Sequence, residues 1–138
     1  MKGIADTGFI VAFLNRNDTH HRWAKSIALR ISPPLPVCEA VLAEAVWHVR
    51  AVVPVTALLK SGLLRLDFDA AAHLDEIERL AERFQNLEPD FADLCVVRMS
   101  ELHRQHVVVT TDIRDFKIYR RFRNQPIPLL TPSGRGEE

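Results

Sequence analysis

The sequence predicts an α/β protein in which helices cover both faces of a central parallel sheet, a three-layer α/β/α sandwich. Short apolar runs such as Lys2–Asp6 and Val107–Thr110 read as strands, and stretches of helical periodicity lie between such runs. Strands that alternate with helices favour parallel pairing. The length of 138 residues and the hydrophobic content of 47% are those of one globular domain. We place this domain at 1–131 and expect a flexible polar tail at 132–138.

The N-terminal half predicts two strands and three helices. In chain order these are a strand at Lys2–Asp6, a helix through Phe9–Leu14, a helix capped by Thr19, a strand at Val37-Cys38 and a helix from Glu39 to about Arg50. Asn15–Asp18 is a polar turn between the first two helices. The helix after Thr19 carries Trp23, Ile27 and Ile31 on one stripe, and the prolines from Pro33 onward end it.

The C-terminal half continues the alternation. The expected elements are a helix at Val52–Ser61, a strand near Leu63–Leu66, an amphipathic helix capped by Asp69, a helix from Pro89-Asp90 to about Arg104, a strand at Val107–Thr110, a short basic helix at Asp115–Arg121 and an edge strand at Ile127–Leu130. In the amphipathic helix the inward positions are Leu74, Ile77, Leu80, Ala81 and Phe84. The continuous β-branched run at Val107–Thr110 predicts a strand covered on both faces.

Charge and cysteine content exclude several classes of function. Eighteen basic residues balance eighteen acidic ones, so binding to a polyanion requires a local patch or a metal ion. Glu44 and Pro54 interrupt the longest apolar stretches, which predicts no transmembrane helix. Asp6 lies where a signal peptide would need apolar residues. Cys38 and Cys95 form no disulfide framework, and together these features predict a protein of the reducing cytoplasm.

Four acidic residues stand in apolar surroundings. Asp6 and Asp112 end predicted strands, Glu44 is the only polar residue in Ala40–Trp47, and Asp93 the only one in Phe91–Val97. Buried carboxylates are paired or bind a metal. If they meet at the carboxyl edge of the sheet, where such folds bind ligands, they form an oxygen site for Mg²⁺ or Mn²⁺. Such a site suits phosphodiester hydrolysis by an activated water, without a covalent enzyme intermediate.

Each acid also has a simpler explanation. Asp6 is a favoured type of N-cap for the helix that follows it. Asp93 stands third in a capping box opened by Asp90. Glu44 has the option of pointing along the edge of its helix, and Asp112 is a common turn residue.

In order, the motifs are Asp6-Thr7, Val41-Leu42-Ala43-Glu44, Asp90-Phe91-Ala92-Asp93 and Val109-Thr110-Thr111-Asp112 followed by Asp115-Phe116. Over Met1 to about Leu130 this order resembles PIN-domain ribonucleases, in particular the VapC-type toxins of toxin–antitoxin pairs. The resemblance implies that Asp6, Glu44, Asp93 and Asp112 are both catalytic and metal-binding.

The resemblance also implies supporting roles for Thr7, Thr110, Asp115 and Asp90, the two threonines by steadying carboxylates or waters. Two positions depart from the family pattern: Leu94 follows the third acid where alanine is usual, and Val37 replaces a common hydroxyl residue. The implied partners are an RNA substrate, a cognate antitoxin protein and a second copy of the chain in a homodimer, with no membrane involved.

A basic segment follows Asp112. It predicts RNA-phosphate contacts beside the metal site, from Arg114, Lys117, Arg120 and Arg121, with Arg123 in the same segment. The alternative is a solvated helix face. No histidine spacing matches a known zinc motif.

Three rival functions stay open. The tripeptide Asp6-Thr7-Gly8 occurs in aspartic proteases, but these need a β-rich fold and a second aspartate. An aspartyl phosphotransferase usually needs an acid where Gly8 stands. The non-enzymatic alternative is a metal-binding or protein-interaction module on the same fold.

Overall fold

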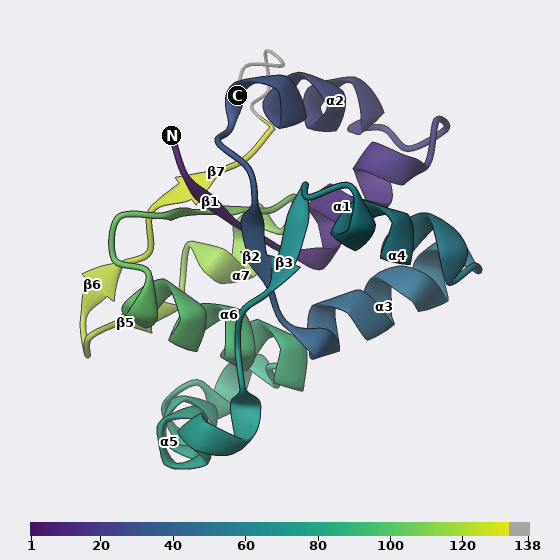
Figure 1. Cartoon of the computed structure of the whole chain (residues 1–138). Helices are drawn as coiled ribbons and strands as arrows, with labels where there is room; N and C mark the ends of the chain where they lie inside the picture. Colours follow the sequence, from purple (N-terminus) through teal and green to yellow (C-terminus); the bar gives the residue numbers. More distant parts are fainter. Residues whose placement is uncertain (133–138) are drawn as a thin grey trace.

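The computed structural model describes residues 1–132, so all but Pro132 of the predicted tail at 132–138 lies outside the described part. The predicted three-layer arrangement is confirmed: helices α1 to α4 gather at the top and right of Figure 1, and α5 and α6 lie at the bottom, with the sheet between them. No helix within the described residues has both the length and the apolar composition needed to cross a membrane.

The strands form a parallel core. They are β1 (Gly3–Ala5), β2 (Leu35–Val37), β3 (Leu64–Leu66), β4 (Val107–Val109), β5 (Arg120–Arg121), β6 (Gln125–Pro126) and β7 (Leu129–Leu130). β4 lies between β1 and β7, and all three are parallel. β2 and β3 form a second parallel pair, with β2 packed beside β1. Within each of these two parallel groups, the carboxyl ends of the strands therefore lie at one edge.

The helices connect these strands and supply the rest of the core. They are α1 (Thr7–Leu14), α2 (His21–Arg30), α3 (Glu39–Val49), α4 (Val53–Lys60), η1 (Ala70–His73), α5 (Leu74–Arg83), η2 (Gln85–Leu87), α6 (Phe91–Leu102) and α7 (Ile113–Phe116). Val108 and Val109 of β4 are fully buried, as their β-branched run predicted. Cys38 and Cys95 are free and buried.

Two predicted helix starts are wrong by a few residues. Thr19 caps nothing: α2 begins at His21, and the carboxylate of Asp18 accepts a hydrogen bond from the His20 backbone N–H. Asp69 caps the short turn η1 rather than the amphipathic helix. The first residue of α5, Leu74, is therefore 51% exposed instead of inward, whereas Ile77 and Leu80 are buried as predicted.

The predicted basic helix at Asp115–Arg121 is also wrong, because α7 ends at Phe116 and Arg120–Arg121 pairs with β6 in an antiparallel hairpin. The guanidinium of Arg120 donates to the Lys117 and Tyr119 carbonyls, which a longer helix would use for backbone bonds. Positive φ angles at Phe122 and Arg123 then turn the chain.

Gly3 permits the tight packing of β1. A Cβ atom there would lie 2.6 Å from Ile31 Cδ1 and 2.7 Å from Val109 Cγ2. We expect Gly3→Ala to lower the free energy of unfolding by about 1–3 kcal/mol, as overpacking of a full core does. The midpoint of urea unfolding measures this, and an unchanged midpoint would show that the two side chains can move aside.

Candidate metal centre

The ends of β1 and β4 bring the first and last predicted acids together. Thr110 donates to Asp6 Oδ2 at 2.6 Å and accepts from the Asp112 backbone N–H at 2.9 Å. Asp6 is only 5% exposed and makes no side-chain cap to α1, although it occupies the N-cap position. Helix capping therefore does not explain this aspartate.

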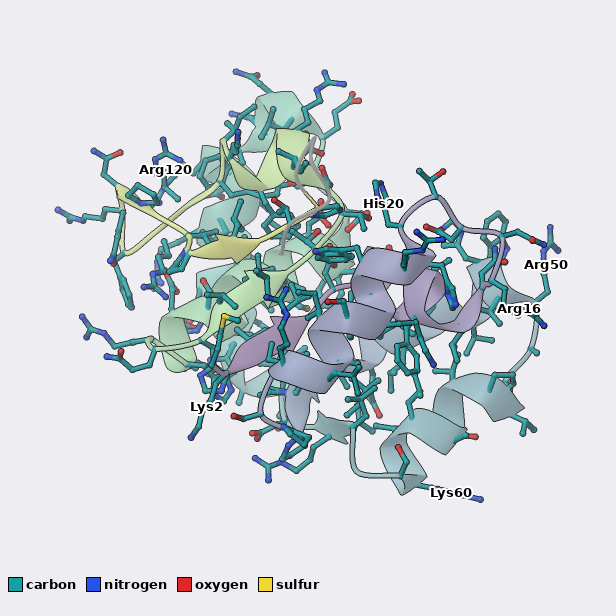
Figure 2. All side chains as sticks on the ribbon, turned by 90° about the horizontal axis from the view of Figure 1, so that it is seen from above. Lys2, Arg16, His20, Arg50, Lys60 and Arg120 are labelled. Carbon is teal, nitrogen blue, oxygen red and sulfur yellow. The ribbon has the colours of Figure 1, made fainter. Side chains whose placement is uncertain are left out.

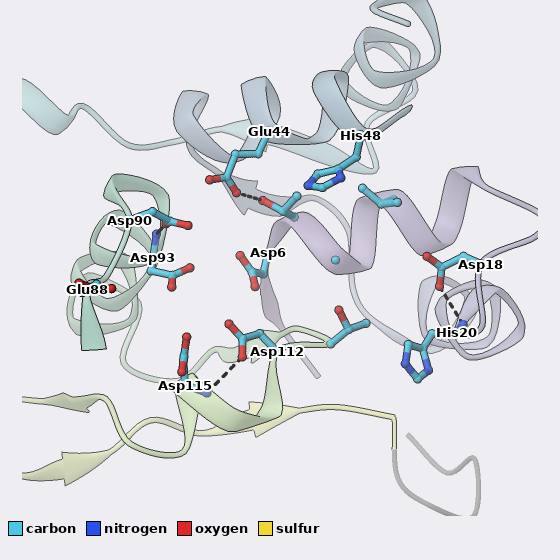
Figure 3. A pocket seen from close by; sticks show the side chains of 14 residues that line it. Asp6, Asp18, His20, Glu44, His48, Glu88, Asp90, Asp93, Asp112 and Asp115 are labelled. Carbon is cyan, nitrogen blue, oxygen red and sulfur yellow. Dashed lines mark hydrogen bonds between the residues drawn. The ribbon is translucent and has the colours of Figure 1, made fainter. Parts of the chain in front are cut away.

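Glu44 on α3 turns toward the same edge. Its Oε1 accepts a hydrogen bond of 2.9 Å from the hydroxyl of Thr7, the first residue of α1. Gly8 follows, where any Cβ atom would overlap the Thr111 hydroxyl, so glycine lets α1 approach the loop after β4. Glu44 thus points into the site rather than along the edge of its helix, as Figure 3 shows.

The carboxylate of Asp93 on α6 makes a hydrogen bond that helix capping does not explain. Asp90 caps the helix through the Asp93 backbone N–H at 2.8 Å, but the Asp93 carboxylate does not return the bond. It accepts instead from the hydroxyl of Tyr119 at 3.0 Å. Tyr119 is fully buried between Phe84 and Phe116, and nothing in the sequence marked it as part of the site.

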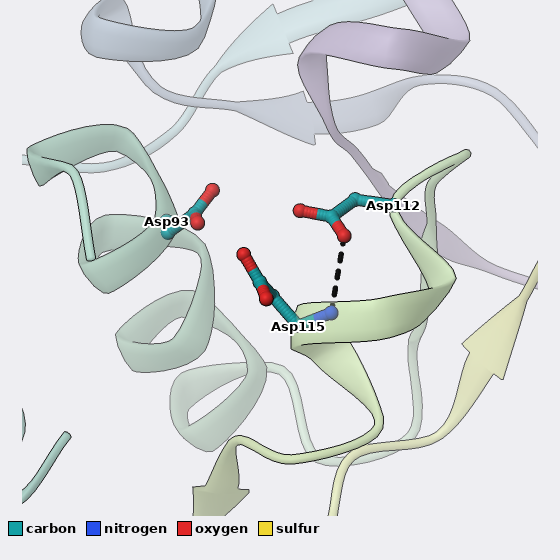
Figure 4. Close-up of side chains that lie close together, drawn as sticks. All are labelled: Asp93, Asp112 and Asp115. Carbon is teal, nitrogen blue, oxygen red and sulfur yellow. Dashed lines mark hydrogen bonds between the residues drawn. The ribbon is translucent and has the colours of Figure 1, made fainter. Parts of the chain in front are cut away.

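Asp112 and Asp115 complete the arrangement. Asp112 Oδ1 caps α7 through the Asp115 backbone N–H at 3.1 Å, so its turn role is real. Carboxylate oxygens of Asp93, Asp112 and Asp115 nevertheless lie within 4.8 Å of one another (Figure 4). Asp115, predicted only as a supporting residue, belongs to the tightest group.

All these acids line one pocket of about 440 Å³, which we call the acidic pocket (Figure 3). Its lining residues are Asp6, Thr7, Gly8, Val11, Asp18, His20, Glu44, His48, Glu88, Asp90, Asp93, Thr111, Asp112 and Asp115. His20 and His48 were not singled out from the sequence, where their spacing matches no ligand motif. No lysine or arginine of residues 1–132 lines it.

Burial and mutual repulsion raise the pKa values of these acids. Burial, then the neighbouring charges of Asp90 and Asp6, raises the pKa of Asp93 to about 8. Burial raises the pKa of Asp6 to about 6, against the opposing Thr110 hydrogen bond. Burial also raises the pKa values of Glu44 and Asp112. Such a cluster holds either protons or a cation.

The donor set fits a hard divalent cation. The ion pairs found among the described residues, Arg65–Asp67 and Arg98–Glu101, involve none of these acids. Clustered carboxylate oxygens without a protein counter-charge match the ligands of Mg²⁺ or Mn²⁺. The residues present therefore fit such an ion, with Asp93, Asp112 and Asp115 nearest to a shared position and Asp6 and Glu44 facing them.

The predicted basic strip divides into exposed and internal residues. Arg114 and Lys117 are exposed, and the charge of Arg114 opposes the raised pKa of Asp112. Arg120 binds backbone carbonyls. Arg121 is 4% exposed and donates to the Ser100 and Arg104 carbonyls, so its predicted RNA contact is wrong: the side chain is used inside the fold.

The hydrogen bond from Tyr119 stabilises the charged form of Asp93. Tyr119→Phe removes this donor and keeps the ring, so we expect the pKa of Asp93 to rise further. Carbon-13 NMR of the aspartate carboxyls in metal-free protein measures this change. An unaltered titration would mean that the hydrogen bond does not form in solution.

Known proteins share features of this sequence and fold. The sequence model of the PIN domain family matches residues 4–124. A solved structure of VapC20 from Mycobacterium tuberculosis, described as a toxin that cleaves the sarcin–ricin loop, superposes with a TM-score of 0.66. The match has 21% sequence identity and covers 76% of this chain and 85% of VapC20, so the likeness concerns the fold. No curated protein matches the chain.

Proposed function

This chain belongs to the PIN domain family, and from that premise we propose that it is a Mg²⁺- or Mn²⁺-dependent endoribonuclease, the toxin of a toxin–antitoxin pair. The observation that carries the proposal is the acidic pocket, where Asp6, Glu44, Asp93, Asp112 and Asp115 converge without a lysine or arginine of residues 1–132 in the lining. A metal-free cluster of this kind is electrostatically costly, and a divalent cation removes the cost.

Each residue has a defined part in the proposed reaction. Asp93, Asp112 and Asp115 hold the ion, and Asp6 and Glu44 complete its surroundings from β1 and α3. Thr110 fixes the orientation of the Asp6 carboxylate, and Thr7 fixes that of Glu44, through the hydrogen bonds described above. When bound, Mg²⁺ or Mn²⁺ supplies the positive charge that activates water and neutralises developing phosphate charge.

Because RNA is negatively charged, its binding beside the acidic pocket requires positive side chains nearby. Arg114 and Lys117 lie two and five residues after Asp112 and are exposed, and Arg120 lies in the adjoining hairpin. We assign RNA-phosphate contacts to these residues. Such contacts position a strand without reading its sequence.

Two protein partners belong to the proposal, an antitoxin and a second copy of the chain. A mostly apolar groove shares no lining residue with the acidic pocket, and its Leu29 is 88% exposed; the groove is lined by Phe13, Lys25, Ala28, Leu29, Leu58, Ser61 and Leu63. Exposed apolar surface of this kind marks protein contacts.

The direct test is cleavage of RNA by antitoxin-free protein with Mg²⁺, with Mn²⁺ or with EDTA. Total RNA from the host is the substrate, and ribosomal RNA with the sarcin–ricin loop is a second, because VapC20 is described as cleaving that loop. We expect discrete fragments with either metal and none with EDTA.

The non-catalytic module on the same fold predicts a different result. Metal would then raise the melting temperature of the protein, but no RNA would be cut under any condition. Absence of both cleavage and metal stabilisation would contradict a metal site altogether and favour a protein-interaction role.

A further inference from the structure

A second pocket, of about 290 Å³, lies at the opposite edge of the sheet and has the opposite chemistry. We call it the basic pocket. Its lining residues are Lys2, Ser32, Pro33, Pro34, Pro36, Arg65, His103 and His106, and no acidic side chain of residues 1–132 is among them.

Strand order places these groups together. Lys2 directly precedes β1 and His106 directly precedes β4, and these strands are parallel neighbours whose amino ends meet at one edge. The Val107 N–H donates to the Lys2 carbonyl and fixes this register. Arg65 comes from β3, and His103 from the turn after α6. In Figure 2, Lys2 lies far from His20, which lines the acidic pocket.

The rim of the basic pocket is made of prolines. Pro33, Pro34 and Pro36 have no backbone N–H, so the donors that face the pocket come chiefly from side chains. The backbone N–H of Ser32 donates to the Met1 carbonyl, so this exposed residue adds its hydroxyl as the donor to the pocket.

The charges of the basic pocket are largely unpaired. Arg65 contacts Asp67 at 3.3 Å, but both side chains are well exposed, at 63% and 42%, so the pair is weak. The rings of His103 and His106 lie 4.8 Å apart. Burial, then the charges of His103 and Lys2, lowers the pKa of His106, and Asp67 opposes them. His106 Nδ1 is shielded from water and has no hydrogen-bond partner within residues 1–132.

We propose that the basic pocket binds a phosphate group. Lys2 and Arg65 supply fixed positive charge, His103 and His106 supply ring donors, and Ser32 supplies a hydroxyl, a donor set suited to a tetrahedral oxyanion. Although the net charge of the chain is zero, the acidic pocket is suited to a cation and the basic pocket to an anion.

This proposal is independent of the ribonuclease reaction, and its test keeps the two apart. Binding of inorganic phosphate is measured by calorimetry in EDTA and at constant ionic strength. Under these conditions no divalent cation occupies the acidic pocket, and no lysine or arginine of residues 1–132 lines it, so it offers the anion no fixed positive charge. We expect a dissociation constant of about 1 mM, weakened roughly tenfold by Arg65→Gln or by Lys2→Gln.

Lys60→Gln and Arg16→Gln are the matched controls, because both side chains are exposed and far from Lys2 (Figure 2). They should leave binding unchanged. Equal weakening by all four substitutions would indicate a nonspecific effect of net charge and would overturn the proposal.

Histidine-ring NMR provides a second readout that does not depend on variants. Phosphate should shift the ring signals of His103 and His106 with saturation, while those of His20 and His48 stay unchanged. Sulfate, which keeps its charge on acidification, should bind more tightly at pH 5 than at pH 8, because His106, whose pKa lies below its ordinary value, gains its proton toward the acidic end of this range. Ring signals that do not respond to either anion would overturn the site.

The source of the phosphate group is decided by comparing a nucleoside monophosphate with a short oligoribonucleotide in EDTA. Tighter binding of the oligonucleotide, lost with Arg65→Gln, assigns the pocket to an RNA backbone phosphate. Equal affinities assign it to a free phosphate or nucleotide. If neither ligand binds more weakly to Arg65→Gln than to the unsubstituted protein, the proposal is contradicted.

Discussion

Replacing Asp6 by Asn is expected to lower metal-dependent RNA cleavage by about 100-fold or more, because even the second shell of a metal site contributes 10–100-fold. Asn keeps the shape and still accepts the hydrogen bond from Thr110, which lies 2.6 Å from Asp6 Oδ2. It removes the negative charge that a cation needs. Burial of that charge raises the pKa of Asp6 to about 6, so its removal should leave the metal-free protein at least as stable.

The measurement pairs RNA cleavage with thermal unfolding, each with and without Mg²⁺ or Mn²⁺. Asp75→Asn on the exposed face of α5 is the matched control and should behave as the unsubstituted protein. Full cleavage by the Asp6 variant would remove this residue from the metal centre. Loss of cleavage accompanied by unfolding would be resolved by the metal-free melting curve.

The stability of the metal-free protein is expected to fall as the pH rises from about 5 to about 8. Burial and neighbouring acids raise the pKa of Asp93 from 3.8 to about 8, and burial raises that of Asp6 to about 6. A carboxyl with a raised pKa binds its proton more tightly when folded, so its contribution to stability is lost as that proton leaves. We expect a decrease in melting temperature of roughly 5 °C or more, since about 1 kcal/mol corresponds to roughly 3–4 °C at this size.

Divalent metal should reverse this trend. Its ligands must be deprotonated, so metal affinity rises over the same pH range. The difference in melting temperature between metal-bound and metal-free protein should therefore be larger at pH 8 than at pH 5.5. Asp93→Asn should flatten the metal-free profile, and Asp75→Asn should not. If the melting temperature of the metal-free protein does not fall as the pH rises, the pKa values of these carboxyls are not raised in solution.

Local pattern was enough to predict much of the fold and the identity of the unusual acids. The helical stripe of Trp23, Ile27 and Ile31 and the apolar run before Thr110 are both patterns among neighbours along the chain. The stripe is buried as expected, and so are Val108 and Val109 of the run. Asp93 and Glu44 stood out because each interrupts an apolar stretch, a feature visible without any tertiary contact. The proposed roles of these acids rest on that feature and on the geometry together.

Where the chain folds back on itself, pattern alone failed. The sequence pattern predicts Arg121 on an exposed basic helix. In the structure it lies in a hairpin, and its guanidinium donates hydrogen bonds to the carbonyls of Ser100 and Arg104. Leu74 had the right spacing to face inward, yet the helix starts there and leaves it exposed. Both errors come from element ends, which depend on hydrogen bonds to distant residues.

The sequence by itself determined the order of strands and helices, the domain-sized core and four acids out of place in apolar surroundings, because these follow from neighbouring residues and their periodicity. Only the tertiary structure decided that Asp115 joins Asp93 and Asp112, that Tyr119 holds the Asp93 carboxylate and that Lys2 and His106 share a pocket. Those contacts depend on strand register and on the rotation of each helix about its axis. Residue spacing along the chain does not specify either.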